Sequence, residues 1–393
     1  MSLVVAMLWL AAVIPSCVLT IFAVEVIAYF IPRSTLAIAQ STDSLAVLVP
    51  AHDEAPIIGQ MLAALLSRDP SIRIVVIADN CSDDTAAIAR ASGVEVVERH
   101  DPLRRGKGFA LAAGRDYLAT NVERPPPICV AVLDADCLPV GNSLALLRDA
   151  VVAWQRPVQS TNLLQGTLSD PPLVQMSNFA FLIKNLVRQR GIAILGGSTI
   201  LTGTGMAFPW PFFAQAALST GNIVEDLGLA IEAARDGNPP AFLETARFLS
   251  PPAAQEATIM QRTRWERGFI GTARKHAFPL IIEGIVRRKR SLFGLGLHLL
   301  VPPFALLIGT ASVVLMAIIV IGAAIGDVAP AILLLSALLV ACGCVFLAWL
   351  AVGRTTLAAS TLWKLPAYVT WKVPLYLGSV SRQSIEWIRT PRR

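Results

Sequence analysis

Two aspartates, Asp134 and Asp136, have the clearest potential for chemistry because they directly follow a continuous apolar run, Ile128 to Leu133. Unbroken apolar character of this length predicts a strand that is buried on both faces of a parallel sheet. Carboxylates at the end of such a strand lie in the crevice where open α/β sheets bind ligands. Their hard oxygen atoms suit a divalent cation that also carries phosphate oxygens. The alternative is a structural role as a turn or helix-cap residue.

Polar clusters follow two earlier predicted strands in the same way. The strand at 45–50 leads into a loop that contains Glu54, and the strand at 72–78 ends in a polar loop that begins at Asp79. These strands alternate with helical segments over short connections, which predicts a mostly parallel, layered α/β sheet. We therefore expect the three polar clusters to converge on one edge of that sheet.

The composition indicates a membrane protein. Hydrophobic residues make up 54% of the 393 residues and charged residues 15%, and the mean hydropathy is +0.61, which is too apolar for an ordinary soluble protein. Apolar runs long enough to span a membrane occur at 3–31, 304–325 and 330–352. A cleaved signal peptide explains the first run less well, because the run lacks a positive start and is too long.

Basic residues predict the orientation in the membrane. Arg33 follows the first run, while Arg287 to Arg290 and Arg354 flank the later pair. The positive-inside rule then places the N-terminus outside, and the central domain and the C-terminus in the cytoplasm. The aromatic and basic tail at 360–393 favours an interfacial amphipathic segment over a fourth span. The predicted parts are a transmembrane helix at 1–32, a cytoplasmic domain at 40–280 and a membrane region at 285–393.

The sequence also argues against several functions and sites. The net charge of +6 is modest, and no basic patch is interleaved with aromatics in a nucleic-acid-binding motif, so no nucleic-acid partner is expected. The six cysteines show no CxxC or Cys/His spacing. We expect free thiols, a reducing compartment around the soluble part, and no structural zinc.

Six short motifs occur in a defined order: Val49–Glu54, Asp79–Asp83, Asp134–Asp136, Thr202–Met206, Glu225–Asp226 and Gln261–Trp265. Together they resemble the membrane-integrated glycosyltransferases of family 2, which include cellulose, chitin and hyaluronan synthases. The motifs cover residues 40–280, and the membrane segments match in layout. The resemblance implies an α/β GT-A domain with a mostly parallel sheet, inserted between one N-terminal and two C-terminal transmembrane helices. It also implies a nucleotide-sugar donor, a UDP-sugar by the family's commonest choice, and Mg2+ or Mn2+ as cofactor.

The resemblance assigns a set of residues to the donor and its metal: Pro50, Ala51, Glu54, Asp79, Lys107, Asp134, Asp136 and Arg264. Asp136, together with Asp134, would hold the metal against the diphosphate, although Asp134 could instead contact the sugar or ribose. Glu54 and Asp79 would lie near the base and ribose, and the alternative for both is a loop-capping role. Lys107 would reach the nucleotide or a phosphate, unless it is a solvated surface lysine.

Asp226, with Glu225 beside it, would act as the general base that takes the proton from the acceptor hydroxyl. The start of a helix would lower the pKa of this carboxyl, whereas burial beside Glu225 would raise it. Direct attack on the anomeric carbon would invert its configuration without a covalent intermediate.

The acceptor side would be lined by Thr204, Gly205, Met206, Gln261 and Trp265. Gln261, Arg264 and Trp265 share one helix face, where Arg264 could neutralise diphosphate oxygens and Trp265 could stack on a sugar. The alternative for Trp265 is a buried structural role. The alternative for Thr204, Gly205 and Met206 is a glycine-rich strand end.

Three spans make a poor conduit for a growing polymer. We therefore expect one sugar, or a few, to be added to a lipid-linked saccharide in exopolysaccharide or capsule assembly. Membrane lipids and polysaccharide-assembly proteins are the expected partners, and a bacterial-type inner (plasma) membrane is the expected location. The alternatives are a processive synthase, transfer to a simple lipid or polyprenyl phosphate and, more distantly, a catalytically silent membrane scaffold.

Overall fold

A computed structural model describes residues 3–32, 38–219, 224–251, 255–366 and 368–369, and for 255–260 only the backbone. Most of the tail predicted to be interfacial, 370–393, lies outside these residues. The last described helix is α14 (Ala359–Leu362).

The first half of the central sheet is parallel, as predicted. It contains β1 (Leu45–Ala51), β2 (Arg73–Asp79), β3 (Glu95–Arg99) and β4 (Cys129–Val132). Strand β1 pairs in parallel with both β2 and β4, and β2 pairs with β3. The carboxyl ends of β2, β1 and β4 are therefore neighbours, and the three polar clusters share one edge of the sheet.

The second half of the sheet is mixed in direction. It contains β5 (Leu138–Pro139), β6 (Val158–Leu164), β7 (Met206–Pro209) and β8 (Ala241–Ser250), and the full order is β3-β2-β1-β4-β7-β6-β8-β5. Strand β7 runs antiparallel to both β4 and β6. Strand β7 begins only at Met206, after Gly203 and Gly205, which adopt positive φ angles of 83° and 60°.

Helices cover both faces of the sheet, which gives three layers. One face packs against α2 (Ala55–Leu66), α3 (Thr85–Ala91) and α5 (Ser143–Trp154), with Ile58 and Leu147 in its core. The other packs against α4 (Lys107–Thr120), α8 (Trp210–Gln215) and α9 (Glu225–Arg235), with Leu111 and Phe213 in its core. Strand β4 is buried at every residue, as its continuous apolar character predicts.

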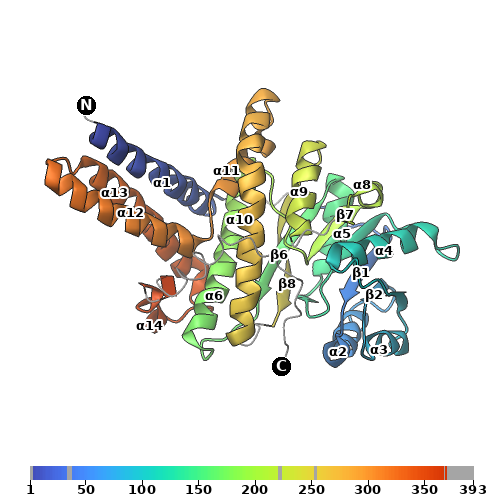
Figure 1. Ribbon diagram of the computed structural model, residues 1–393. Coiled ribbons are helices and arrows are strands. Elements are labelled where there is room, and N and C mark those ends of the chain that lie inside the picture. Colours follow the sequence, from blue (N-terminus) through green and yellow to red (C-terminus); the bar gives the residue numbers. More distant parts are fainter. Residues whose placement is uncertain (1–2, 33–37, 220–223, 252–254, 367, 370–393) are drawn as a thin grey trace.

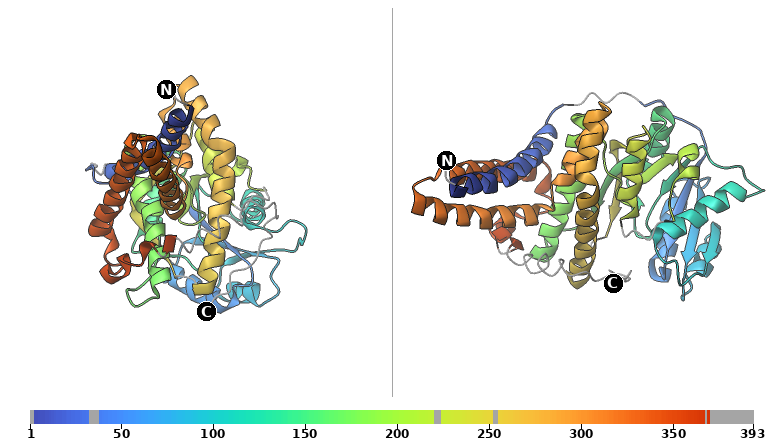
Figure 2. Two further views of the ribbon diagram at one scale, coloured as in Figure 1. Left: turned by 60° about the vertical axis from the view of Figure 1, so that its left-hand side comes forward. Right: turned by 45° about the horizontal axis from the view of Figure 1, so that its top comes forward.

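Within the described residues, three helices are long and apolar enough to cross a membrane, as predicted: α1 (Leu3–Ala28), α12 (Phe304–Ile325) and α13 (Ala329–Ala348), which continues into the π-helix η2 (Trp349–Gly353). They pack together on one side of the molecule, away from the sheet (Figures 1 and 2). Many of their large apolar side chains are exposed, which suits contact with lipid.

A layer of helices lies between the spans and the sheet (Figure 2). It consists of α6 (Pro172–Leu182), the π-helix η1 (Ile183–Arg188), α7 (Gln189–Ile194), α10 (Gln255–Val286) and α11 (Arg290–Leu300). Residues of α6 and η1 share a hydrophobic core with α1 and the C-terminal spans. Gln261, Arg264 and Trp265, which the sequence predicts on one helix face, all lie in α10.

A buried charged network joins the first span to this layer. Glu25 in α1 accepts hydrogen bonds from Arg188 Nε at 2.6 Å and pairs with His298 Nδ1 at 2.9 Å. All three side chains are buried. Gly191 permits this contact, because a Cβ atom there would lie 1.8 Å from the carbonyl oxygen of Glu25. The acid inside the first span therefore serves as a tie between two layers.

Replacing Glu25 with alanine would leave the Arg188 guanidinium buried without its carboxylate. We expect the free energy of unfolding to fall by about 3–5 kcal/mol, measured by thermal unfolding of the full chain in detergent. The double variant Glu25→Leu/Arg188→Leu should regain much of this loss, since it removes both charges. A Glu25→Ala variant that melts like the parent protein would contradict the assignment.

Candidate active site

Lys107 is the centre of the site. It begins α4, and its ammonium forms an ion pair with Asp134 and donates a hydrogen bond to the carbonyl oxygen of Gly203 at 2.6 Å. The positive φ of Gly203 turns this carbonyl toward the lysine. Lys107 is therefore not a solvated surface lysine, and it joins the end of β4 to the loop before β7.

Two acids from the first turn of α9 lie beside this lysine. A Cβ atom at Gly203 would be 3.4 Å from both Asp226 Oδ2 and Lys107 Nζ. Burial disfavours charge on Lys107, but the acids Asp134, Glu225 and Asp226 outweigh it and raise the lysine pKa. One ammonium is therefore shared among three carboxylates.

The pKa values of these two acids are raised. Burial, and then the charge of Asp226, raises the pKa of Glu225 to about 8. Burial likewise raises the pKa of Asp226, although the amide of Leu227, which donates to Asp226 Oδ1 at 2.8 Å, opposes the shift. Burial thus outweighs the start of the helix, which favours the charged form. A carboxylate with a raised pKa suits general-base catalysis.

The loop before β7 holds the backbone of Asp134 in place through hydrogen bonds. The amide of Asp134 donates to Thr204 Oγ1 at 3.0 Å, and the side-chain amide of Gln159 donates to the Thr204 carbonyl at 3.0 Å. A Cβ atom at Gly205 would lie 2.4 Å from Ser160 Oγ. Met206 is 1% exposed within the core, so only its backbone could meet an acceptor. The acceptor role predicted for these residues stays a prediction.

Helix α10 brings the last predicted motif toward the site. The Arg264 guanidinium is close enough to Glu225 and Asp134 to feel their charges, although burial still lowers its pKa. Trp265 packs on Phe181 of α6, with ring centroids 5.9 Å apart, and beside the Arg262 guanidinium. Arg264 therefore faces the acids, while Trp265 has a packing role in addition to any contact with an acceptor. Gln261 is half-buried on the same helix.

The residues predicted to hold the nucleoside lie at the neighbouring strand ends. Pro50 and Ala51 end β1, and Asp79 ends β2. Arg99 donates to Asp79 Oδ1 at 2.6 Å, and the amide of Glu54 donates to Thr85 Oγ1 at 2.8 Å. These polar groups line the same sheet edge as Asp134 and Asp136.

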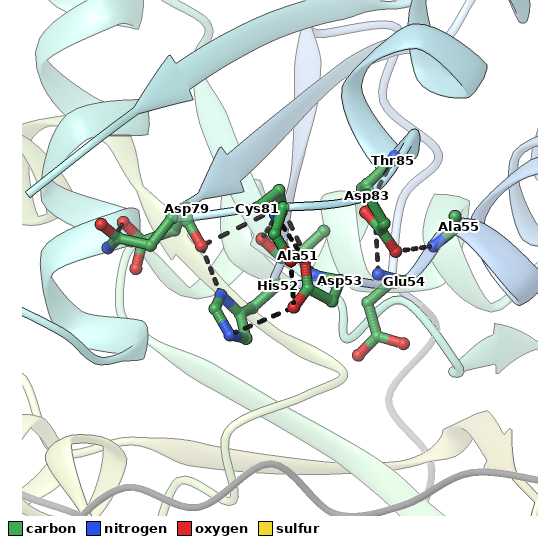
Figure 3. A network of polar contacts seen from close by, with 11 residues as sticks. Ala51, His52, Asp53, Glu54, Ala55, Asp79, Cys81, Asp83 and Thr85 are labelled. Atoms are coloured by element: carbon green, nitrogen blue, oxygen red, sulfur yellow. Dashed lines mark hydrogen bonds and ion pairs between the residues drawn. The ribbon is translucent and has the colours of Figure 1, made fainter. Parts of the chain in front are cut away.

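A second polar network fills the loops between these strands (Figure 3). Asp53, Cys81 and Asp83 bring three possible metal-ligand atoms within 4.8 Å of one another. Asp53 Oδ1 accepts from the Ser82 amide at 2.7 Å, and Asp83 Oδ2 accepts from the Ala55 amide at 3.1 Å. These hydrogen bonds tie the two loops together, which accounts for the acids without an ion.

Several contributors have no sequence signal. Contacts between distant segments bring in the Gly203 carbonyl, Gln159 and Arg99, and no local sequence pattern predicts these contacts. The six cysteines are free, as expected. Burial raises the pKa of Cys129 and of Cys137 to about 12, so neither thiol is a nucleophile at neutral pH.

We predict that Glu225→Gln stabilises the protein in a pH-dependent way. The pKa of Glu225 is about 8 in the folded chain against an ordinary 4.5, so the folded state keeps a proton that the unfolded chain releases. Its contribution to stability therefore falls as pH rises across this interval. Glu225→Gln should melt several degrees above the parent near pH 8, and no higher near pH 4.5. Asp236→Asn, at the exposed end of α9, is the control; equal melting of parent and Glu225→Gln across this range would contradict the assignment.

Comparisons with known proteins bear on the fold and on the family. Over its whole length the fold is similar to a mannosyltransferase from Pyrobaculum calidifontis solved with GDP-Man and Mn2+, with a TM-score of 0.54, 17% identity and 95% of each chain covered. A glucosyl-3-phosphoglycerate synthase from Mycobacterium tuberculosis, solved with Mn2+ and UDP, matches at a TM-score of 0.40 and 21% identity over 59% of this chain and 86% of its own.

Among curated proteins, a 4,4'-diaponeurosporenoate glycosyltransferase from Staphylococcus aureus is 31% identical over 96 residues. That match covers 24% of each chain, so it spans about a quarter of the relative's length.

The model of a family described as "Glycosyltransferase like family 2" matches residues 42–268, which is more than half of the chain. The predicted family and the predicted GT-A fold between one N-terminal and two C-terminal apolar helices are thereby confirmed. The chain belongs to glycosyltransferase-like family 2.

Proposed function

We propose that this protein transfers a sugar from a nucleoside-diphosphate donor to a hydroxyl of a membrane-associated acceptor, with inversion at the anomeric carbon. The observation that carries the proposal is the convergence of Lys107, Asp134, Glu225 and Asp226 at the edge of the parallel strands. The family membership and the three apolar helices support the reaction class and the membrane setting.

The donor would lie along the ends of β2, β1 and β4. Glu54 and Asp79 would accept hydrogen bonds from the base and ribose, and Pro50 and Ala51 would form the wall beside them. Lys107 and Arg264 would contact the diphosphate, because both cations lie among the acids at this edge. A UDP-sugar is the proposed donor, and the archaeal mannosyltransferase with the similar fold was solved with GDP-Man.

The acids fit a divalent cation, Mg2+ or Mn2+. Three carboxylates lie around one ammonium, and burial, followed by the charge of Asp226, raises the pKa of Glu225. Lys107 already pairs with Asp134, so Asp136 is the proposed direct ligand of the metal. Asp134 would support Asp136 at the metal or contact the sugar. When bound, such an ion would neutralise the charge that develops on the leaving diphosphate.

Asp226 would take the proton from the attacking hydroxyl as the new glycosidic bond forms and the bond to the diphosphate breaks. Lys107 and Arg264 would stabilise the departing phosphate oxygens. Glu225 would lie beside Asp226 as a largely protonated acid near neutral pH, because its pKa is raised to about 8. No covalent intermediate is needed, because the acceptor attacks from the side opposite the leaving group.

A lipid-linked saccharide is the proposed acceptor, in exopolysaccharide or capsule assembly at the cytoplasmic face of an inner membrane. Helix α6 supports this, because it packs on the spans through Met176 and Phe179 and also contacts Trp265 through Phe181. An acceptor anchored in the membrane would meet the site along this helix. Transfer to a simple lipid or polyprenyl phosphate is the second candidate, favoured by the same position.

Asp226→Asn should abolish transfer while leaving the donor bound. We expect kcat to fall by about 10²–10⁴-fold, with little change in donor KM, in an assay of nucleoside-diphosphate release from UDP-, GDP- and TDP-sugars. Asp236→Asn, at the exposed end of the same helix, is the matched control. Unchanged turnover in Asp226→Asn would overturn the assignment of the base.

Single addition predicts short products. With a labelled donor and membrane extract as acceptor source, products should gain one or a few sugars, because the three apolar helices of the described residues make a poor conduit for a long chain. Resolving the labelled products by size checks this directly. A ladder of long polymers would instead identify a processive synthase.

A further inference from the structure

Two basic side chains near the site have no place in the donor geometry. Lys184 lies on η1, and Arg262 lies one turn before Glu266 on α10. Lys184 is close enough to the proposed base, Asp226, and to Arg262 for their charges to interact. Both cations therefore belong to the side of Asp226 that faces α6 and α10.

Arg262 lies over two aromatic rings. Its Nε atom donates to Ser177 Oγ at 2.9 Å, and its Cζ atom lies 4.5 Å from the Phe181 centroid and 4.9 Å from the Trp265 centroid. The ring contacts use no N–H donor and Ser177 uses one, so among the described residues the guanidinium keeps N–H groups at its edge for another acceptor. Such an edge suits two-point binding of a carboxylate or phosphate.

Lys184 presents the second cation from the facing helix. Its Nζ atom lies 5.7 Å from the Phe269 centroid. Ser177, Phe181 and Lys184 are spaced four and three residues apart, so they follow one face of α6 and η1. The two cations thus approach the same space from η1 and from α10.

The chain pairs one cation of η1 but not the other. Arg188, four residues after Lys184, has Glu25 at 2.6 Å. Within the described part of the chain, neither Lys184 nor Arg262 has a carboxylate at ion-pair distance. Burial accordingly lowers the pKa of Lys184, and it lowers that of Arg262 to about 10. The charge of Glu266 acts on both cations, and that of Asp226 acts on Lys184, but only from beyond ion-pair distance, so an anion that contacts both cations directly would stabilise them.

We propose that Lys184 and Arg262 bind an oxyanion, a carboxylate or phosphate, that the acceptor carries, and that this contact sets the acceptor hydroxyl at Asp226. The inference rests on the proposed transferase function and narrows its substrate to an acidic acceptor. The oxyanion is the head group of an amphiphile, because α6 also packs against the spans.

Binding of simple probes tests this without turnover. The full chain in dodecyl maltoside micelles is titrated with dodecyl phosphate, with dodecanoate and with inorganic phosphate, and tryptophan fluorescence reports binding. We expect saturable binding of an anionic amphiphile, weakened about tenfold or more by Lys184→Gln and by Arg262→Gln, as loss of one charge-assisted contact predicts. Lys184→Arg should keep most of the affinity. Lys275→Gln and Arg274→Gln, at exposed positions on α10, are the matched controls.

The outcomes separate the inference from the function on which it rests. Equal binding by the parent and both Gln variants would overturn the oxyanion site, and equally tight binding of inorganic phosphate would overturn the amphiphile as its source. Binding of UDP with Mn2+ is measured in the same samples, together with the melting temperature. Retained UDP binding in Lys184→Gln assigns the loss to the acceptor side, whereas absent UDP binding in the parent would contradict the transferase itself.

Discussion

The site depends on one electrostatic constraint: three carboxylates converge on a single ammonium. Lys107 from α4 holds Asp134 at the end of β4, and the two acids of α9 lie within reach of the same charge. Burial raises the pKa of both Glu225 and Asp226, the charge of Asp226 adds to the shift of Glu225, and the charge of Asp134 adds to both, so added positive charge would stabilise the cluster. The parallel strand order, the positive φ of Gly203 and the support of Thr204 behind Asp134 all serve this arrangement.

The site also depends on the connection between this cluster of acids and the apolar helices. One π-helical segment, η1, directs Arg188 toward the first span and Lys184 toward the base. π-helical turns are uncommon and often occur at functional sites. Because Glu25 pairs with Arg188, a buried ion pair joins the first apolar helix to the segment that carries Lys184. The proposed lipid-anchored acceptor would meet Asp226 beside this connection.

Much of this could be predicted from sequence. The buried strand before Asp134, the polar ends of β1 and β2, and the apolar spans follow from continuous apolar runs and their abrupt ends. The antiparallel strand β7 could not be predicted, because strand direction depends on distant pairing. The contact partners of Lys107, Trp265 and Glu25 could not be predicted either, because each contact joins segments far apart in the chain. Met206 lay in a correctly identified motif, but its side chain packs in the core.

We propose that the acids at the end of β4 hold the donor's divalent cation. Electron paramagnetic resonance of Mn2+ titrated into the full chain with UDP measures this directly. We expect Asp136→Asn to weaken UDP-dependent Mn2+ binding strongly, while Asp83→Asn, in the other group of possible ligands, leaves it intact. Loss of Mn2+ binding in Asp83→Asn with normal binding in Asp136→Asn would contradict this assignment.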